Sequence, residues 1–190
     1  MAEAADADPT VLIVDDEPQL LEVFSLFLEA EYAVQTANGG EEAIEAVDES
    51  IDAALLDRRM PDLRGDEVLR EFRKQGYTFP VAMVTAVEPE FDIVELPFDE
   101  YVTKPIDGDY LRSVVELLLT RGEYDEESRE FFRLASKKAA LESSDESGSD
   151  LEDREEYAEI VRRMSELESA LSETLAQLSE ADMEAAYRRL

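Results

Sequence analysis

The sequence predicts an α/β protein with a doubly wound parallel sheet, followed by an all-helical module. From about residue 10 to residue 121, short runs of β-branched and apolar residues alternate with longer amphipathic stretches, which is the pattern of repeated strand–helix units. Several short runs, such as VLIV, AALL and VAMV, are apolar throughout, as expected for strands covered on both faces. Beyond residue 121 the strand-like runs stop and the apolar spacing becomes helical.

Five runs are predicted to form strands, and the stretches between them to form helices. The strands are expected at residues 10–14, 33–37, 53–57, 81–85 and 100–103. The helices are expected at residues 18–29, 41–48 and 66–75 and from residue 109 onward. Pro18 suits the first turn of the first helix. This alternation predicts a flavodoxin-like fold, in which binding sites lie beyond the carboxyl ends of the strands.

The segment after residue 121 is predicted to be helical. A helix over about residues 126–141 is followed by a Ser-, Asp- and Gly-rich break at residues 143–150 and a second helix from about residue 151. The second helix carries apolar residues every three or four positions, at Tyr157, Ile160, Met164, Leu167, Leu171 and Leu178. This stripe predicts packing within the chain, with a dimer seam as the alternative. A capping pattern at Ser179 predicts a last short helix.

The composition excludes several kinds of site. The chain has no His, no Cys and no Trp, which excludes Cys/His zinc sites, thiol and imidazole nucleophiles and disulfides. A chain without Cys suits a reducing compartment. The first residues show no signal-peptide pattern and no apolar run approaches the roughly 18 residues of a spanning helix. We therefore expect a cytoplasmic protein without membrane contact.

The chain is strongly acidic, with 49 Asp and Glu against 18 Lys and Arg and a formal net charge of −31. Repulsion of this size destabilises a compact state unless salt screens it. The balance resembles that of proteins from halophiles that accumulate salt. The alternative is an acidic mesophilic protein that stays folded at low salt.

Polar side chains stand at the carboxyl ends of four predicted strands. Asp15 and Asp16 follow the first strand, Asp57 ends the third, Thr85 ends the fourth and Lys104 follows the fifth. In a parallel sheet these ends meet at one edge, so the side chains are expected to converge. Three converging carboxylates repel one another unless a divalent cation binds between them, and all-oxygen ligands favour Mg²⁺. Each Asp could instead merely cap the helix that follows it.

Over residues 10–121 the series Asp-Asp, Asp with Met-Pro and Gly after it, Thr, and Lys-Pro resembles the receiver domain of two-component response regulators. The resemblance implies that Asp57 is the phosphoacceptor. It also implies that Asp15, Asp16, Asp57 and the backbone carbonyl of Arg59 hold Mg²⁺. A receiver is not an enzyme beyond its own phosphorylation and dephosphorylation. Because the chain has no His, a separate histidine kinase or phosphotransfer protein is the implied donor.

The resemblance extends to the residues that sense the phosphoryl group. Thr85 is implied to be the switch hydroxyl, Tyr101 the switch aromatic residue and Lys104 the cation that binds the phosphoryl group. The peptide bond between Lys104 and Pro105 is implied to be cis. A carboxylate nucleophile with nearby positive charge suits phosphoryl transfer, which needs mainly alignment and charge neutralisation.

The sequence departs from the receiver pattern in two places. The interval from Thr85 to Lys104 is short, and Pro97 interrupts the stretch where the fourth helix is expected. We predict that this helix is short or remodelled. Receivers commonly signal through the face formed by the fourth helix, the fifth strand and the fifth helix, so we do not expect the standard dimerisation through that face. Arg58 and Arg59 directly follow Asp57; Arg59 either reaches over the phosphoryl group or is solvated.

The segment after residue 121, with Arg129-Glu-Phe-Phe and Ala135-Ser-Lys-Lys, resembles the HalX domain found after receivers in haloarchaea. The chain then divides into a flexible acidic tail (residues 1–9), a receiver domain (residues 10–121) and a HalX-like helical output domain (residues 122–190). Arg129, Arg133 and Lys137 form a basic stripe, for which local ion pairs with Glu126 and Glu130 are favoured over DNA contact.

The implied function is a response regulator that relays phosphorylation of Asp57 to a helical output module, with transcription regulation as the expected output. The alternative output is a protein-interaction or dimerisation adaptor without DNA binding, and a homodimer is one expected assembly. Both outputs use the same phosphorylation site.

Overall fold

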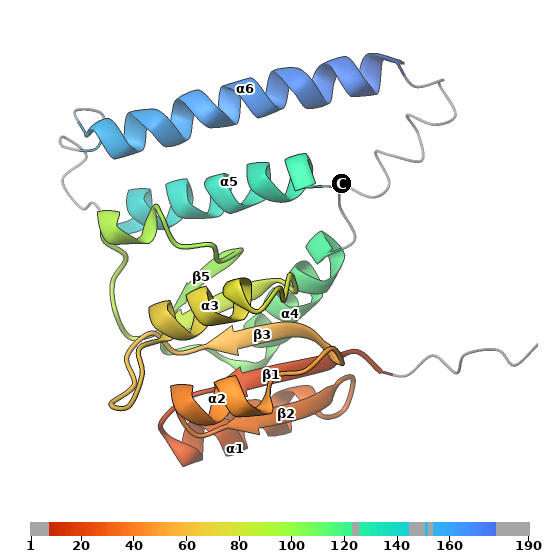
Figure 1. Cartoon of the computed structure of the whole chain (residues 1–190), viewed down its shortest axis with the longest axis vertical. Coiled ribbons are helices and arrows are strands. Elements are labelled where there is room, and N and C mark those ends of the chain that lie inside the picture. Colours follow the sequence, from red (N-terminus) through yellow and green to blue (C-terminus); the bar gives the residue numbers. More distant parts are fainter. Residues whose placement is uncertain (1–7, 123–125, 145–150, 152–153, 178–190) are drawn as a thin grey trace, which may run out of the picture.

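The structure is a computed structural model that describes residues 8–122, 126–144, 151 and 154–177. A five-stranded parallel sheet in the order β2-β1-β3-β4-β5 forms its centre (Figure 1). The strands are β1 (Thr10–Val14), β2 (Ala33–Ala37), β3 (Ile51–Leu56), β4 (Val81–Thr85) and β5 (Glu100–Thr103). The order confirms the predicted doubly wound sheet. Strand β3 begins and ends earlier than predicted, so Asp57 lies just beyond its end.

Helices cover both faces of the sheet. They are α1 (Pro18–Leu28), α2 (Gly40–Ala46), α3 (Gly65–Lys74) and α4 (Gly108–Gly122). Helices α1 and α4 pack with Val11 and Ile13 of β1, whereas α2 and α3 pack with Leu12 and Val14. Successive strand residues point to opposite faces. Because helices cover both faces, each central strand needs a continuous apolar run rather than alternating apolar and polar residues. This explains why runs such as VLIV mark the strands.

The connection between β4 and β5 contains only one 3₁₀ turn, η1 (Phe91–Ile93), among its described elements. The predicted shortening of this helix is therefore confirmed. Ile93, Leu96 and Phe98 of this connection are nevertheless almost completely buried. Because a single turn cannot cover them, another part of the chain must do so.

Helices α5 (Glu126–Ser144) and α6 (Glu155–Gln177), which we call the helical hairpin, provide this cover. Figure 1 shows α5 between α6 and the α/β domain. Ala140 and Leu141 of α5 and Ile160 of α6 belong to the same apolar core as Ile93 and Phe98. The hairpin and the sheet thus share one core, and burial of each large apolar side chain contributes about 1.5–3 kcal/mol.

The apolar stripe of α6 packs within the chain, as predicted. Tyr157, Ile160 and Met164 lie against the shared core, and Leu167 is buried. The side chains of Leu171 and Leu178 lie outside the described residues, as do the predicted last helix, the tail before residue 8 and residues 145–150 of the break. None of the described helices is both long enough and apolar enough to cross a membrane.

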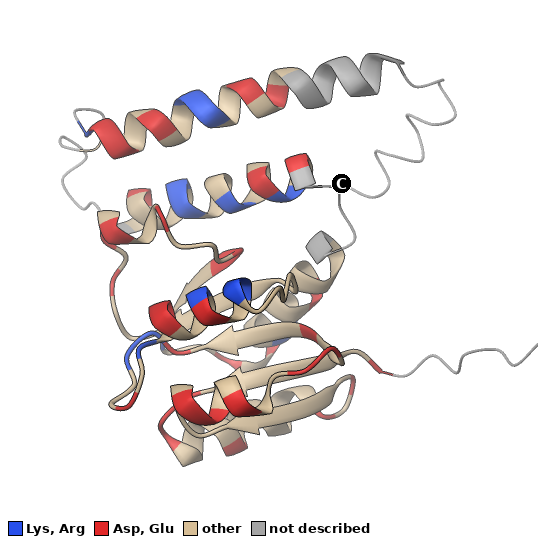
Figure 2. Cartoon of the chain, viewed as in Figure 1, with Lys and Arg blue, Asp and Glu red and all other residues tan. Residues whose placement is uncertain are grey.

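Two residues of the basic stripe of α5, Arg133 and Lys137, have partners beyond the predicted local ones. Arg133 Nε donates to Asp99 Oδ1 at 2.8 Å and Lys137 Nζ donates to the Val94 carbonyl at 2.6 Å, so both face the α/β domain. Glu130 pairs instead with Arg163 of α6, at 2.8 Å from Nε, and the side chain of Glu126 lies outside the described residues. Figure 2 shows Lys and Arg on the side of α5 that faces the sheet. Arg133 and Lys137 therefore have partners from distant elements, in addition to the attraction between Arg133 and Glu130 on the same helix.

Burial of Lys137 predicts a pH-dependent stability. Burial, followed by repulsion from Arg133, lowers the pKa of Lys137 from 10.5 to about 8, although Asp99 opposes this shift. Between these values the unfolded chain binds a proton that the folded chain does not, so stability should increase as pH rises from about 8 to 10.5. The expected gain is on the order of 3 kcal/mol at most. Denaturant unfolding in molar KCl at several pH values measures it.

The substitution Lys137→Met should remove this increase, because Met does not titrate. Lys138→Met is the matched control, since Lys138 is partly exposed and pairs with Glu142, at 2.6 Å, near Tyr157 of α6. The control should keep the pH dependence of the native chain. Equal slopes for the native chain and Lys137→Met would contradict the prediction.

Candidate functional site

Three carboxylates meet at the carboxyl edge of the sheet. Val14 and Leu56 are register partners in β1 and β3, so the residues that follow them, Asp15 and Asp57, lie side by side. One oxygen each of Asp15, Asp16 and Asp57 lies within 4.8 Å of the others. Asp15 and Asp57 are buried, with 2% and 7% of their surface exposed, and Asp16 is partly exposed. The predicted convergence is confirmed.

Lys104 links two of these carboxylates. Its Nζ lies 2.5 Å from Asp15 Oδ2 and 3.4 Å from Asp57 Oδ2. The Lys104 amide also donates to the Thr85 carbonyl at 2.8 Å, which fixes the end of β5 against β4. The peptide bond between Lys104 and Pro105 is cis, as expected. One cation among three carboxylates leaves two negative charges, which a divalent cation would balance.

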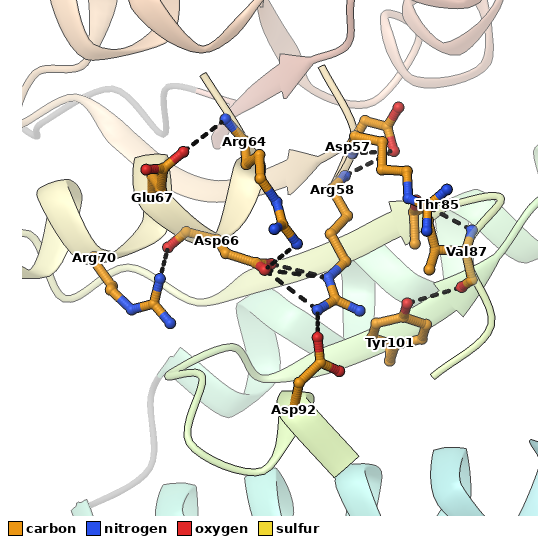
Figure 3. Close-up of polar contacts among 11 residues, drawn as sticks. Asp57, Arg58, Arg64, Asp66, Glu67, Arg70, Thr85, Val87, Asp92 and Tyr101 are labelled. Carbon is orange, nitrogen blue, oxygen red and sulfur yellow. Dashed lines mark hydrogen bonds and ion pairs between the residues drawn. The ribbon is translucent and has the colours of Figure 1, made fainter. Parts of the chain in front are cut away.

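Thr85 and Tyr101 both contact Val87, in the loop after β4. Thr85 is completely buried, and its Oγ1 accepts a hydrogen bond from the Val87 amide at 3.3 Å. The Tyr101 hydroxyl donates to the Val87 carbonyl at 2.8 Å (Figure 3). Burial raises the pKa of Tyr101 because the phenolate is poorly solvated. The two residues therefore hold Val87 together: Thr85 bonds to its amide and Tyr101 to its carbonyl.

The backbone after Asp57 holds its carboxylate. The Arg58 amide donates to Asp57 Oδ1 at 2.7 Å, and the Arg59 amide lies 3.4 Å from the same oxygen. The Arg59 side chain belongs to an exposed residue, which favours the solvated alternative. A Cβ atom on Gly65 would lie 2.2 Å from the Asp57 carbonyl, so only glycine allows α3 to approach this backbone so closely.

Arg58 has a role that the sequence analysis missed. It is only 3% exposed, and its Nε lies 3.0 Å from Asp66 Oδ1 at the start of α3. Its Nη2 donates to Asp66 Oδ2 and to Asp92 of η1 (Figure 3). Burial alone would lower the pKa of Arg58, but the hydrogen bonds to Asp66 and Asp92 outweigh it and raise the pKa.

A signal for this role was present in the sequence. Successive side chains at the end of β3 point to opposite faces of the sheet, so the side chain of Arg58 points away from that of Asp57 and toward the face that α3 covers. A buried guanidinium requires an acidic partner, and Asp66 in the first turn of α3 is such a partner. The partnership with Asp92 had no comparable signal.

Comparison with protein families matches residues 11–116 to the response regulator receiver domain and residues 120–187 to the HalX domain. The chain belongs to the response regulator receiver family. Its receiver is followed by a HalX domain, which contains the helical hairpin. Receivers are phosphoacceptors rather than enzymes in the usual sense.

Two curated relatives are similar to this chain over part of their length. A "Putative transcriptional regulator" of Haloferax volcanii is 48% identical over 140 residues, which are 73% of this chain and 24% of that protein. The alkaline phosphatase synthesis transcriptional regulatory protein PhoP of Bacillus subtilis is 39% identical over 118 residues, 60% of this chain and 49% of that protein. The chain thus spans about a quarter to a half of these relatives.

Solved receiver structures share the fold. Response regulator TrrA of Thermotoga maritima, in complex with Mg²⁺ and BeF, is 34% identical with a TM-score of 0.51, covering 58% of this chain and 99% of that chain. Chemotaxis protein CheY4 of Vibrio cholerae is 27% identical with a TM-score of 0.55, covering 60% of this chain and all (100%) of that chain. Both matches cover about three fifths of this chain.

Proposed function

We propose that this response regulator accepts a phosphoryl group on Asp57 from a separate histidine kinase or phosphotransfer protein and relays the change to its HalX domain. The observation that carries the proposal is the position of Asp57 Oδ2, 3.4 Å from Lys104 Nζ and beside Asp15 and Asp16. A receiver implies such a donor, and the chain has no His of its own. We propose the boundary between the two domains at residues 121–122, after the receiver match ends at residue 116 and just inside the HalX match, which begins at residue 120.

The three carboxylates fit a magnesium ion. Their oxygens lie close together, they are hard ligands, and they exceed the single lysine by two charges. We propose Asp15, Asp16, Asp57 and the backbone carbonyl of Arg59 as the residues that hold it. When bound, Mg²⁺ supplies positive charge for the oxygens of the phosphoryl group. The structure of TrrA with Mg²⁺ and BeF supports this assignment.

The residues of the chain have distinct tasks in the transfer. A carboxylate oxygen of Asp57 forms a bond to phosphorus while the nitrogen–phosphorus bond of the donor breaks. The electron pair of the broken bond stays on the donor nitrogen. Lys104, held by Asp15, balances charge on the phosphoryl oxygens. Thr85 then moves toward the phosphoryl group and donates a hydrogen bond from its hydroxyl to one of these oxygens, which shifts the Val87 amide that is bonded to its Oγ1. Tyr101, which holds the same loop residue, is expected to respond with it.

Metal removal tests the proposed site. The chain, incubated with acetyl phosphate and Mg²⁺ in molar KCl, should gain the mass of one phosphoryl group, and EDTA should prevent this gain. Asp16→Asn should raise the Mg²⁺ concentration needed by more than about tenfold. Asp109→Asn, at an exposed carboxylate in α4, should behave like the native chain. Labelling that is insensitive to EDTA would contradict the metal site.

The relatives' names support transcription regulation as the output. A specific observation favours the alternative, a protein-interaction or dimerisation adaptor. Arg133 and Lys137 are engaged with the receiver, and the exposed side of α6 carries Glu155, Glu156 and Glu159, which would repel DNA phosphates. Sizing in molar KCl with and without beryllofluoride, followed by titration with DNA, separates the two outputs.

A further inference from the structure

We propose that Arg58 is a positioning residue that couples phosphorylation of Asp57 to the docking of the helical hairpin. The coupling passes through the ion pair between Arg58 and Asp92. This inference rests on the proposed function of Asp57 and assigns a role to a residue that the phosphoryl-transfer chemistry leaves unused.

Arg58 connects the phosphorylation site with η1. Its amide holds Asp57 Oδ1 at 2.7 Å. Its buried guanidinium lies between Asp66 of α3 and Asp92 of η1, with the Tyr101 ring beside it (Figure 3). The side chain of Asp66 is 9% exposed and that of Asp92 is 53% exposed. Asp66 is therefore the fixed partner and Asp92 the partner that water can replace.

The segment that contains Asp92 is also the segment on which α5 docks. Within residues 91–99, the Val94 carbonyl accepts a hydrogen bond from Lys137 at 2.6 Å, and the Phe98 ring lies 5.4 Å from the same Nζ. Asp99 accepts from Arg133 at 2.8 Å. A shift of residues 91–99 would therefore act directly on α5.

The connection between α5 and α6 reaches the same segment. The guanidinium carbon of Arg154, just before α6, lies 5.1 Å from the centre of the Phe91 ring, next to Asp92 in sequence. Helix α5 and the residue before α6 thus both contact residues 91–99, and Arg58 holds this segment through the half-exposed carboxylate of Asp92.

Phosphorylation changes the electrostatics around Arg58 in one direction. It replaces the single charge of the Asp57 carboxylate with a dianionic group next to Arg58 in the chain. The Arg58 side chain points away from Asp57, so the added negative charge acts on the guanidinium across the end of β3; it weakens the hold of Asp92, whose carboxylate can be rehydrated at little cost. We therefore expect phosphorylation to weaken the pair between Arg58 and Asp92 and to loosen α5 from residues 91–99. A ligand shifts an equilibrium only through such a difference between the states.

A purely structural role for Arg58 would be neutralisation of Asp66. Arg64 contributes to that task from the surface, at 3.1 Å from Asp66 Oδ2, with a side chain that is 57% exposed. The pair of Arg64 with Asp66 therefore serves as the matched comparison. It involves the same carboxylate as the pair of Arg58 with Asp66, but it does not reach η1.

Hydrogen exchange of the full chain in molar KCl and Mg²⁺, with and without beryllofluoride, tests the inference. In the native chain, beryllofluoride should protect the amides around Asp57 and make those of α5 exchange about three- to tenfold faster. Asp92→Asn should show the faster exchange in α5 without beryllofluoride and little further change with it, while the response around Asp57 remains. Asp92→Glu should restore the native behaviour in part, and Arg64→Met should behave like the native chain.

The outcomes separate the inference from the proposed function. If Asp92→Asn keeps the full native response in α5, the inference is overturned and the proposed function stands. If the amides around Asp57 do not respond to beryllofluoride in the native chain, both are overturned. Arg58→Met should reproduce Asp92→Asn; circular dichroism identifies a folding defect in this variant, and Asp92→Asn remains decisive because Asp92 is half exposed.

Discussion

Asp57→Ala is expected to reduce phosphorylation of the chain by acetyl phosphate or by a cognate kinase to below detection. Among the described carboxylates, Asp57 follows a central strand and lies beside both the pair Asp15 and Asp16 and the Lys104 ammonium, which is 3.4 Å from its Oδ2. Asp15 lies even closer to the Lys104 ammonium, at 2.5 Å; Asp57 is proposed as the nucleophile because it matches the phosphoacceptor position of the receiver family. Intact-mass spectrometry with Mg²⁺ in molar KCl measures the result.

Two controls distinguish loss of the nucleophile from loss of the fold. Asp57→Asn keeps the size of the side chain and should also remain unlabelled, with a circular dichroism spectrum like that of the native chain. Asp109→Asn, at the exposed start of α4, should be labelled normally. A phosphoryl group that persists in both Asp57 variants would place the phosphoacceptor elsewhere.

Lowering KCl from molar to millimolar concentration is expected to unfold the chain. A net charge of −31 is screened over about 3 Å in 1 M salt but over about 30 Å in 0.01 M salt. Asp and Glu are spread over the α/β domain and the helical hairpin alike (Figure 2), so no single region can relieve the repulsion. Circular dichroism should show loss of helix and a lower melting temperature as salt is removed.

The cause of this unfolding can be tested with a second salt. If screening is responsible, NaCl and KCl should restore the helix equally at equal ionic strength, because the Debye length depends on ionic strength alone. An unchanged spectrum and melting temperature at low salt would show that the chain is an acidic protein without a need for salt.

The fold and the centre of the site could be predicted because their signals are local in sequence. Continuous apolar runs mark the strands, and Asp15, Asp57 and Lys104 each follow a strand within one residue of its end. The parallel arrangement then places these strand ends at one edge whatever the surroundings are. The positions of the strands and of the site residues therefore follow from short stretches of sequence.

Other features depended on pairs that sequence spacing does not reveal. Arg58 and Asp92 are 34 residues apart, and so are Arg133 and Asp99. The sequence predicted that the helix between β4 and β5 would be short. It did not predict that α5 would cover the apolar residues of this connection in its place. The local interpretation of the basic stripe missed the distant partners of Arg133 and Lys137. A buried cation takes whichever carboxylate or carbonyl the packing brings near, and packing of the hairpin on Ile93 and Phe98 decides which partners those are.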